Sequence, residues 1–127
     1  MCLRGSSEVE NVILAHEPSV ELAAYVAWVP ELGAQPKDVP GGMGLVPDTR
    51  ALHYWDAQEL LGRAYERILP TPGPAWDVYL IFGRGVRWSG ATPPRPDYWM
   101  HQLGGVTSGP RLNPEVLRDH VEQLLRV

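Results

Sequence analysis

One apolar stretch constrains the fold of this chain more than any other. Residues Val78–Phe82 read VYLIF, which has the length and the β-branched and aromatic content of a central strand. Gly83-Arg84-Gly85 follows at once, and its two glycines tolerate the positive φ angles of a tight reversal. Val86-Arg87-Trp88 then alternates as a return strand. A phosphate-binding glycine loop would be followed by a helix, so the sequence predicts a β-hairpin here.

Three other segments have the caps and the apolar spacing of amphipathic helices. They begin at the capping residues Ser7, Asp56 and Asn113. Pro18 and Pro70 mark the ends of the first two, because the residue before a proline avoids the α region. Apolar residues recur at helical spacing in all three segments, which predicts one buried face on each helix.

The remaining apolar segments are predicted as strands. Val20–Val29 is apolar at almost every position, as in a strand that is buried on both faces of a sheet. Arg50–Trp55 is a shorter strand, preceded by the long irregular loop Pro30–Thr49, in which one helical turn could follow Pro36. Within a second long loop, Ser89–Leu112, the segment Asp97–Leu103 is predicted as a helical turn or a short extended piece. The order is therefore α-β-β-α-β-β-α.

This order resembles the second half of a thioredoxin-like fold, in the branch that contains peroxiredoxins and thiol-disulfide reductases. The resemblance is carried by HYWD at 53–56, by PAWDVYLIFGRGVRWSG at 74–90, and by the order of the elements. HYWD, AWDVYLIFG and WMHQL also resemble segments of bacterial proteins of this type. The resemblance covers most of the chain. It implies a single domain, residues 1–127, that is an α/β three-layer sandwich around a mixed sheet with its first strand missing.

The family's redox chemistry depends on a Cys-x-x-Cys motif at the start of the first helix. The matching positions here are Cys2-Leu3-Arg4-Gly5, with glycine in place of the second cysteine. Pro74 is the nearest candidate for the family's cis-proline, but two residues separate it from Asp77 and the hairpin strand. Cys2 is the one candidate catalytic residue, as a monothiol activated by a helix N-terminus. The alternative is an incidental cysteine in a loosely held chain end.

Aromatic side chains gather around the predicted loops and could line a pocket or an interface. The candidate ligand-binding residues are Trp55, Trp76, Tyr98, Trp99 and His101. The alternative is that they cover a core that has only one phenylalanine. The histidines and the single cysteine lack the spacing of a zinc motif, so the sequence predicts no metal and no cofactor.

Charge and composition narrow the class of partner. The chain has 11 Lys and Arg against 15 Asp and Glu, a formal net charge of −4, which argues against a nucleic-acid binder. The arginines are scattered, and a small arginine-lined anion site, for example at Arg84 and Arg87, stays open. No signal peptide and no membrane-spanning run is visible, so the sequence predicts a cytoplasmic protein without a membrane contact.

Three functions fit these observations. The first is a non-catalytic binding or interaction module on a degenerate thioredoxin-like scaffold, supported by the absence of a paired thiol. The second is a monothiol oxidoreductase or peroxidase-like enzyme that uses Cys2. The third is a small-ligand binder in an aromatic-lined cleft between the loops Pro30–Thr49 and Ser89–Leu112. Because the missing strand leaves an apolar edge at Val20–Val29, the sequence also predicts a homodimer or larger assembly.

Overall fold

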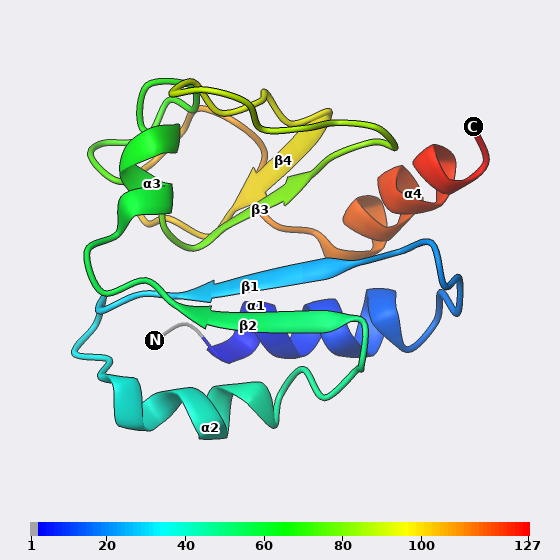
Figure 1. Cartoon of the computed structure of the whole chain (residues 1–127), viewed down its shortest axis with the longest axis horizontal. Helices are drawn as coiled ribbons and strands as arrows, with labels where there is room; N and C mark the ends of the chain where they lie inside the picture. Colours follow the sequence, from blue (N-terminus) through cyan, green and yellow to red (C-terminus); the bar gives the residue numbers. More distant parts are fainter. Residues whose placement is uncertain (1–2) are drawn as a thin grey trace. The chain divides into compact units, whose positions relative to one another are not determined.

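The computed structural model describes residues 3–127 as a mixed α/β chain (Figure 1). Its strands form two two-stranded sheets, β1–β2 and β3–β4, where the sequence predicts one mixed sheet. The chain divides into two compact units, the first ending at Glu59 and the second comprising Leu60–Val127. Within residues 3–127, no helix is both long enough and apolar enough to cross a bilayer.

The first unit is a parallel strand pair with helices packed against one face. Strand β1 pairs with β2 in the register from Ala24↔Ala51 to Trp28↔Trp55, and α1 runs along the pair (Figure 1). Side chains of Leu14, Val46 and Ala51 form its buried core. The elements are α1 (Leu3–Glu8), the π-helix η1 (Val9–Leu14), β1 (Ala24–Trp28), the 3-10 helix η2 (Pro36–Asp38), α2 (Val39–Met43) and β2 (Ala51–Trp55).

The contact between β1 and α2 requires a glycine. A Cβ added to Gly42 would lie 2.9 Å from ring atoms of the buried Trp28 side chain. The absence of a side chain at Gly42 therefore lets the indole of Trp28 pack directly on the backbone of α2. The helical turn expected after Pro36 is thus confirmed as η2, and it continues into α2, which packs against β1.

The second unit combines an antiparallel strand pair with two helices. Strand β3 pairs with β4 in the register from Val78↔His101 to Ile81↔Tyr98. Tyr65, Leu69 and Ala75 form its buried core, and Val78, Leu80 and Trp99 pack against them. The elements are α3 (Leu60–Tyr65), β3 (Val78–Ile81), β4 (Tyr98–His101) and α4 (Pro114–Leu125).

The predicted hairpin is correct in its turn and wrong in its second strand. The turn forms, because the Val86 N–H donates to the Gly83 carbonyl oxygen at 3.4 Å and Gly85 has a φ of 82°. Residues 86–88 are not a strand, however, and β4 is the partner of β3. The reason is that the Asp97 N–H donates to the Ile81 carbonyl oxygen at 2.8 Å, where a return strand would have to pair.

The long loop from Phe82 to Asp97 is closed at its base by that aspartate. The Asp97 carboxylate accepts the Gly83 N–H at 2.6 Å, in addition to the bond that its own N–H makes. Of the two predictions for Asp97–Leu103, the extended one is confirmed, because residues 98–101 form β4.

The predicted helices begin and end at different residues, except at the C-terminal helix. The first helix begins at Leu3, and the Ser7 hydroxyl accepts a bond from the Asn11 side chain. Helix α3 begins at Leu60, so Asp56 is not its N-cap. At α4 the prediction is confirmed, because the Asn113 side chain accepts the Val116 N–H at 3.2 Å.

The prediction of a ten-residue strand buried on both faces is wrong. Strand β1 has five residues, and Val20, which lies outside it, is 93% exposed. Tyr25 within the strand is 71% exposed, so only one face of β1 is covered. The chain reverses first at Ser19, whose carbonyl oxygen accepts the Leu22 N–H, and this turn uses residues that the apolar pattern assigns to the strand. The thioredoxin-like sandwich and the single domain stay predictions.

Candidate functional site

The five predicted aromatic-site residues come from both units of the chain. Trp55 ends β2 in the first unit, whereas Trp76 and the β4 residues Tyr98, Trp99 and His101 belong to the second. Successive residues of a strand point to opposite faces, so Tyr98 and Trp99 do not line one pocket. Cys2 lies outside the described residues. The cleft between the loops 30–49 and 89–112 stays a prediction.

Because Tyr98 and Trp99 point to opposite faces of β4, their rings contact different partners. The ring of Tyr98 stacks on that of His120 in α4, with centroids 3.5 Å apart and planes 13° apart. The ring of Trp99 lies against that of His101, with centroids 5.6 Å apart. Tyr98 therefore packs β4 against α4, and Trp99 faces the core on the other side. Both contacts fit aromatic residues that cover a core. This is the alternative to a ligand pocket that the sequence left open.

His101 is completely buried and uses both ring nitrogens within the fold. The Leu103 N–H donates to its Nδ1 atom at 3.1 Å, so the proton of the ring resides on Nε2. Nε2 then donates to the Ser108 carbonyl oxygen, also at 3.1 Å. A ring with neither nitrogen available cannot bind a metal or transfer a proton, and its role here is to hold the loop after β4.

His53 has the same arrangement in the first unit. The Trp28 indole N–H donates to Nδ1 at 3.1 Å, and Nε2 donates to the Val46 carbonyl oxygen at 3.1 Å. The Trp28 and His53 rings lie within 5° of parallel. Among residues 3–127, no three His, Cys, Asp or Glu side chains gather in a metal-ligating group.

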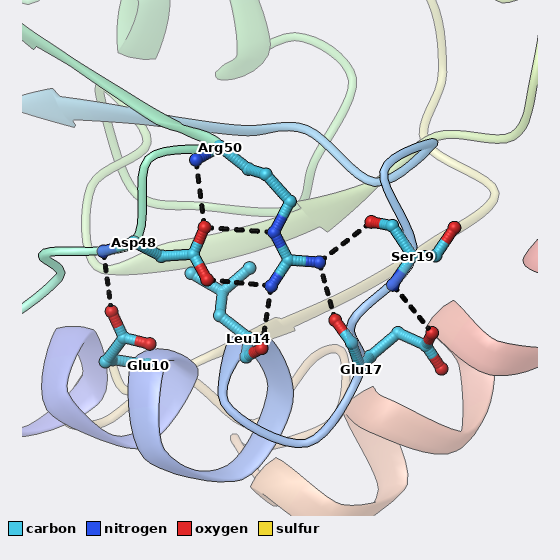
Figure 2. Close-up of polar contacts among 6 residues, drawn as sticks. All are labelled: Glu10, Leu14, Glu17, Ser19, Asp48 and Arg50. Carbon is cyan, nitrogen blue, oxygen red and sulfur yellow. Dashed lines mark hydrogen bonds and ion pairs between the residues drawn. The ribbon is translucent and has the colours of Figure 1, made fainter.

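A dense polar cluster surrounds Arg50 (Figure 2). Its Nε and Nη2 atoms donate to the two carboxylate oxygens of Asp48 at 2.9 and 2.7 Å. Nη2 also reaches the Leu14 carbonyl oxygen at 2.7 Å, and Nη1 donates to the carbonyl oxygens of Glu17 and Ser19. All five N–H groups of the guanidinium are therefore used. Sequence reasoning missed this cluster, because Arg50 precedes β2 without any local motif.

Arg50 acts as a distant cap for the first helix. The carbonyl oxygen of Leu14, at the end of η1, lacks a partner in the next turn and carries the negative end of the helix dipole. A cation placed there donates a hydrogen bond to this carbonyl oxygen and also compensates the negative end of the helix dipole. Asp48 holds the guanidinium in place, and the Glu10 carboxylate accepts the Asp48 N–H at 2.9 Å. The cluster thus joins η1 to the start of β2.

Acid is expected to weaken this cluster in a defined pH window. The hydrogen bonds from Arg50 lower the pKa of Asp48 from 3.8 to about 2. A carboxyl group whose pKa is lower in the folded state stabilises the fold fully above its unfolded pKa, and the contribution is lost as the pH falls through the folded one. We expect wild type to lose about 2 kcal/mol between roughly pH 5 and pH 2, measured by urea unfolding.

The matched variant is Asp48→Asn, which cannot ionise. Its free energy of unfolding should be lower than that of wild type at neutral pH, and the difference should shrink as the pH approaches 2. If the difference is the same at both pH values, the Asp48–Arg50 pair does not contribute as described.

A solvent-exposed apolar surface lies on the outer side of the first sheet. Tyr25 and Leu52 are register partners, as are Ala27 and Tyr54, so all four side chains lie on the same face. Tyr25, Leu52 and Tyr54 are 71%, 49% and 52% exposed. We call these four residues the open face. The alternation of side chains along β1 and β2 predicts which residues share a face. The sequence alone does not show which of the two faces stays uncovered.

A groove of about 340 Å³ lies in the second unit, between the end of α3 and the loop before β4. Its lining includes two exposed arginines four residues apart, Arg63 in α3 and Arg67 just after it. We call it the α3 groove; it is lined by Arg63, Ala64, Glu66, Arg67, Ile68, Ala91, Thr92 and Pro93. The spacing of the two arginines, at i and i+4, is the signal that sequence reasoning did not use.

Comparison with known proteins supplies no relative from which to infer a site. No protein-family model, no curated protein and no solved structure matches this chain.

Proposed function

We propose that this chain is a non-catalytic interaction module that binds a second copy of itself through the open face. The observation that carries the proposal is the exposure of Tyr25, Leu52 and Tyr54 on one side of a parallel strand pair. Parallel strands are normally covered on both faces, because their side chains are apolar on both. An uncovered aromatic face of this kind is typical of a protein contact.

The chemistry of the open face favours a second copy as the occupant. In a twofold contact the same patch of both copies is buried, and a residue near the axis meets its own copy, so an uncharged patch avoids repulsion between like charges there. Tyr25, Ala27, Leu52 and Tyr54 are all uncharged. Tyrosine also tolerates partial exposure in the monomer, since its hydroxyl stays hydrated while its ring is buried in the contact.

The hydrogen bonds of the polar side chains support a binding function rather than a catalytic one. His53, His101 and Arg50 have the residue types of acid–base or anion chemistry, yet the fold uses all their ring or guanidinium nitrogens. Groups held in this way stabilise the protein and have no free atom for a substrate. The proposal therefore keeps the first of the three functions that the sequence suggests.

The size of the surface predicts a weak dimer. A fully exposed large aromatic side chain presents roughly 200 Å², so the three exposed residues contribute roughly 300–400 Å² per copy. A stable dimer usually buries about 800 Å² per copy. Neighbouring residues must supply the rest, and we expect a dissociation constant of roughly 10–100 µM.

We propose further that the scaffold is a reduced thioredoxin-like sandwich. The order of the main elements supports it: helix, two strands, helix, two strands and helix, with the short η2 and α2 between β1 and β2. The parallel pairing of β1 with β2 and the antiparallel pairing of β3 with β4 are compatible with a mixed sheet of that kind.

Sedimentation and light scattering across protein concentrations test the dimer. Wild type should move from monomer to dimer over a range of roughly 1 µM to 1 mM. Leu52→Glu should remain monomeric throughout, because each copy would have to bury a carboxylate in the contact. Val20→Glu is the matched control, since it adds the same charge at a 93% exposed position outside the open face.

The two variants separate the contact from general charge effects. Val20→Glu should associate like wild type, and circular dichroism should show the same fold in all three proteins. The proposal is wrong if wild type stays monomeric over the whole range, or if Leu52→Glu associates as wild type does.

A further inference from the structure

We propose that the α3 groove binds a phosphate monoester with a small apolar body. This inference is independent of self-association, because the groove and the open face belong to different units. It goes beyond the interaction function by assigning a ligand class to a second surface.

Charge is distributed unevenly along the chain. The unit that ends at Glu59 has nine Asp and Glu against three Lys and Arg, a formal charge of −6. Leu60–Val127 has eight arginines against six acids, a formal charge of +2. An acidic protein therefore has its excess of arginines in the unit that contains the groove. Five of them lie before β4, all exposed: Arg63, Arg67, Arg84, Arg87 and Arg95.

Arg67 of the groove differs from Arg50 in one respect. The guanidinium of Arg50 is fully occupied by partners within its own unit. Within residues 3–127, no described hydrogen bond or ion pair involves the Arg67 side chain, although it lines the groove. An exposed guanidinium beside a concave surface can offer its fork of N–H groups to an anion.

The donor set favours phosphate over carboxylate. Arg67 presents a fork that pairs with two oxygens, Arg63 adds a second positive charge to the lining, and the Thr92 hydroxyl adds another donor. A carboxylate has two oxygens and satisfies one fork. A phosphate monoester has three terminal oxygens, so it can fill the fork of Arg67 and still offer an oxygen to the hydroxyl.

The other residues that line the groove limit the size, polarity and charge of the part of the ligand beyond the phosphate. Ala64, Ile68 and Pro93 make part of the groove apolar, which suits a short hydrocarbon or aromatic body. A volume of about 340 Å³ lies at the small end of ligand sites, which excludes a large molecule. Glu66, which also belongs to the lining, opposes additional negative charge, so a polyphosphate should bind less well than a monoester.

Amide chemical-shift titration of the full chain tests the proposal with phenyl phosphate, inorganic phosphate and benzoate as probes. Phenyl phosphate should bind with a dissociation constant of roughly 0.1–1 mM, and the shifts should gather at residues 63–68 and 91–93. Inorganic phosphate should bind at the same residues at least about threefold more weakly, because it lacks the apolar body. Benzoate should also bind more weakly.

Arg67→Gln should weaken the binding of phenyl phosphate at least about fivefold. Arg126→Gln is the matched control, because it removes the same charge at an exposed position of the same unit. It should change the affinity less than about twofold. An unchanged spectrum outside the groove shows that each variant is folded.

Four results would overturn the inference. They are an absence of saturable shifts, shifts centred away from the groove, an equal loss in Arg67→Gln and Arg126→Gln, and benzoate binding as tightly as phenyl phosphate. The last would replace the phosphate assignment with a carboxylate. The others would mean that the arginines act only through general electrostatics or not at all.

Discussion

Replacing Arg50 with alanine is expected to lower the free energy of unfolding by about 3 kcal/mol. The variant loses five donors at once and leaves the Asp48 carboxylate beside three backbone carbonyl oxygens that have lost a donor. Removing one partner of a buried charge pair costs roughly 3–5 kcal/mol, and we take the lower end because the two side chains are 17% and 18% exposed. Urea unfolding followed by tryptophan fluorescence measures the effect.

Two further variants show what the guanidinium contributes. Arg50→Lys keeps the charge but has a single nitrogen, which cannot reach the carbonyl oxygens of Leu14 and Ser19 and the carboxylate together, so it should recover less than half of the loss. Arg4→Ala removes an 82% exposed arginine that pairs with Glu8, and should cost less than about 0.5 kcal/mol. If Arg50→Ala costs no more than Arg4→Ala, the cap described for η1 does not stabilise the chain.

Gly62→Ala should destabilise the second unit by about 2 kcal/mol or more. A Cβ at Gly62 would collide with the carbonyl oxygen of Ala75 and lie 3.1 Å from the Ala75 nitrogen. These are backbone atoms, fixed by the bond that the Ala75 N–H donates to the Gly62 carbonyl oxygen at 2.9 Å. Alanine normally favours a helix over glycine by about 1 kcal/mol, so destabilisation would mean that the collision outweighs propensity.

The control for this variant lies in the same unit. A Cβ at Gly104 has no atom within 4 Å, and its φ is not positive, so Gly104→Ala should be neutral or stabilising by up to about 1 kcal/mol. Thermal unfolding and hydrogen exchange of α3 and β3 compare the two variants. Equal stability of the two proteins would show that α3 does not approach the segment before β3 this closely.

Local signals in the sequence were sufficient where one short segment decides the structure. Asn113 and Pro114 give the cap and the first turn of α4, because both effects act within four residues. The apolar run at Val78 predicts β3, and ALHYW predicts β2 to within one residue. The Gly83–Val86 turn also formed as expected, because glycine tolerates its backbone angles.

Contacts between distant segments were not predictable in this way. The strand that pairs with β3 is 98–101 rather than 86–88, because Asp97 takes the hydrogen bonds at the end of β3. For the candidate sites, the sequence identified His101 and the aromatic residues but not their partners. Hydrogen bonds from Leu103 and to Ser108 turn His101 into a structural residue.

By itself, the sequence determined the α/β class, the positions of β2, β3 and α4, and the turn after β3, since these depend on apolar spacing, capping and backbone preference over a few residues. Only the tertiary structure decided which face of β1–β2 stays open, which strand completes β3, and that Arg50 reaches carbonyl groups 31 to 36 residues earlier in the chain. The physical reason is that hydrogen bonding and burial between remote segments depend on where the whole chain brings them, and no local pattern carries that information.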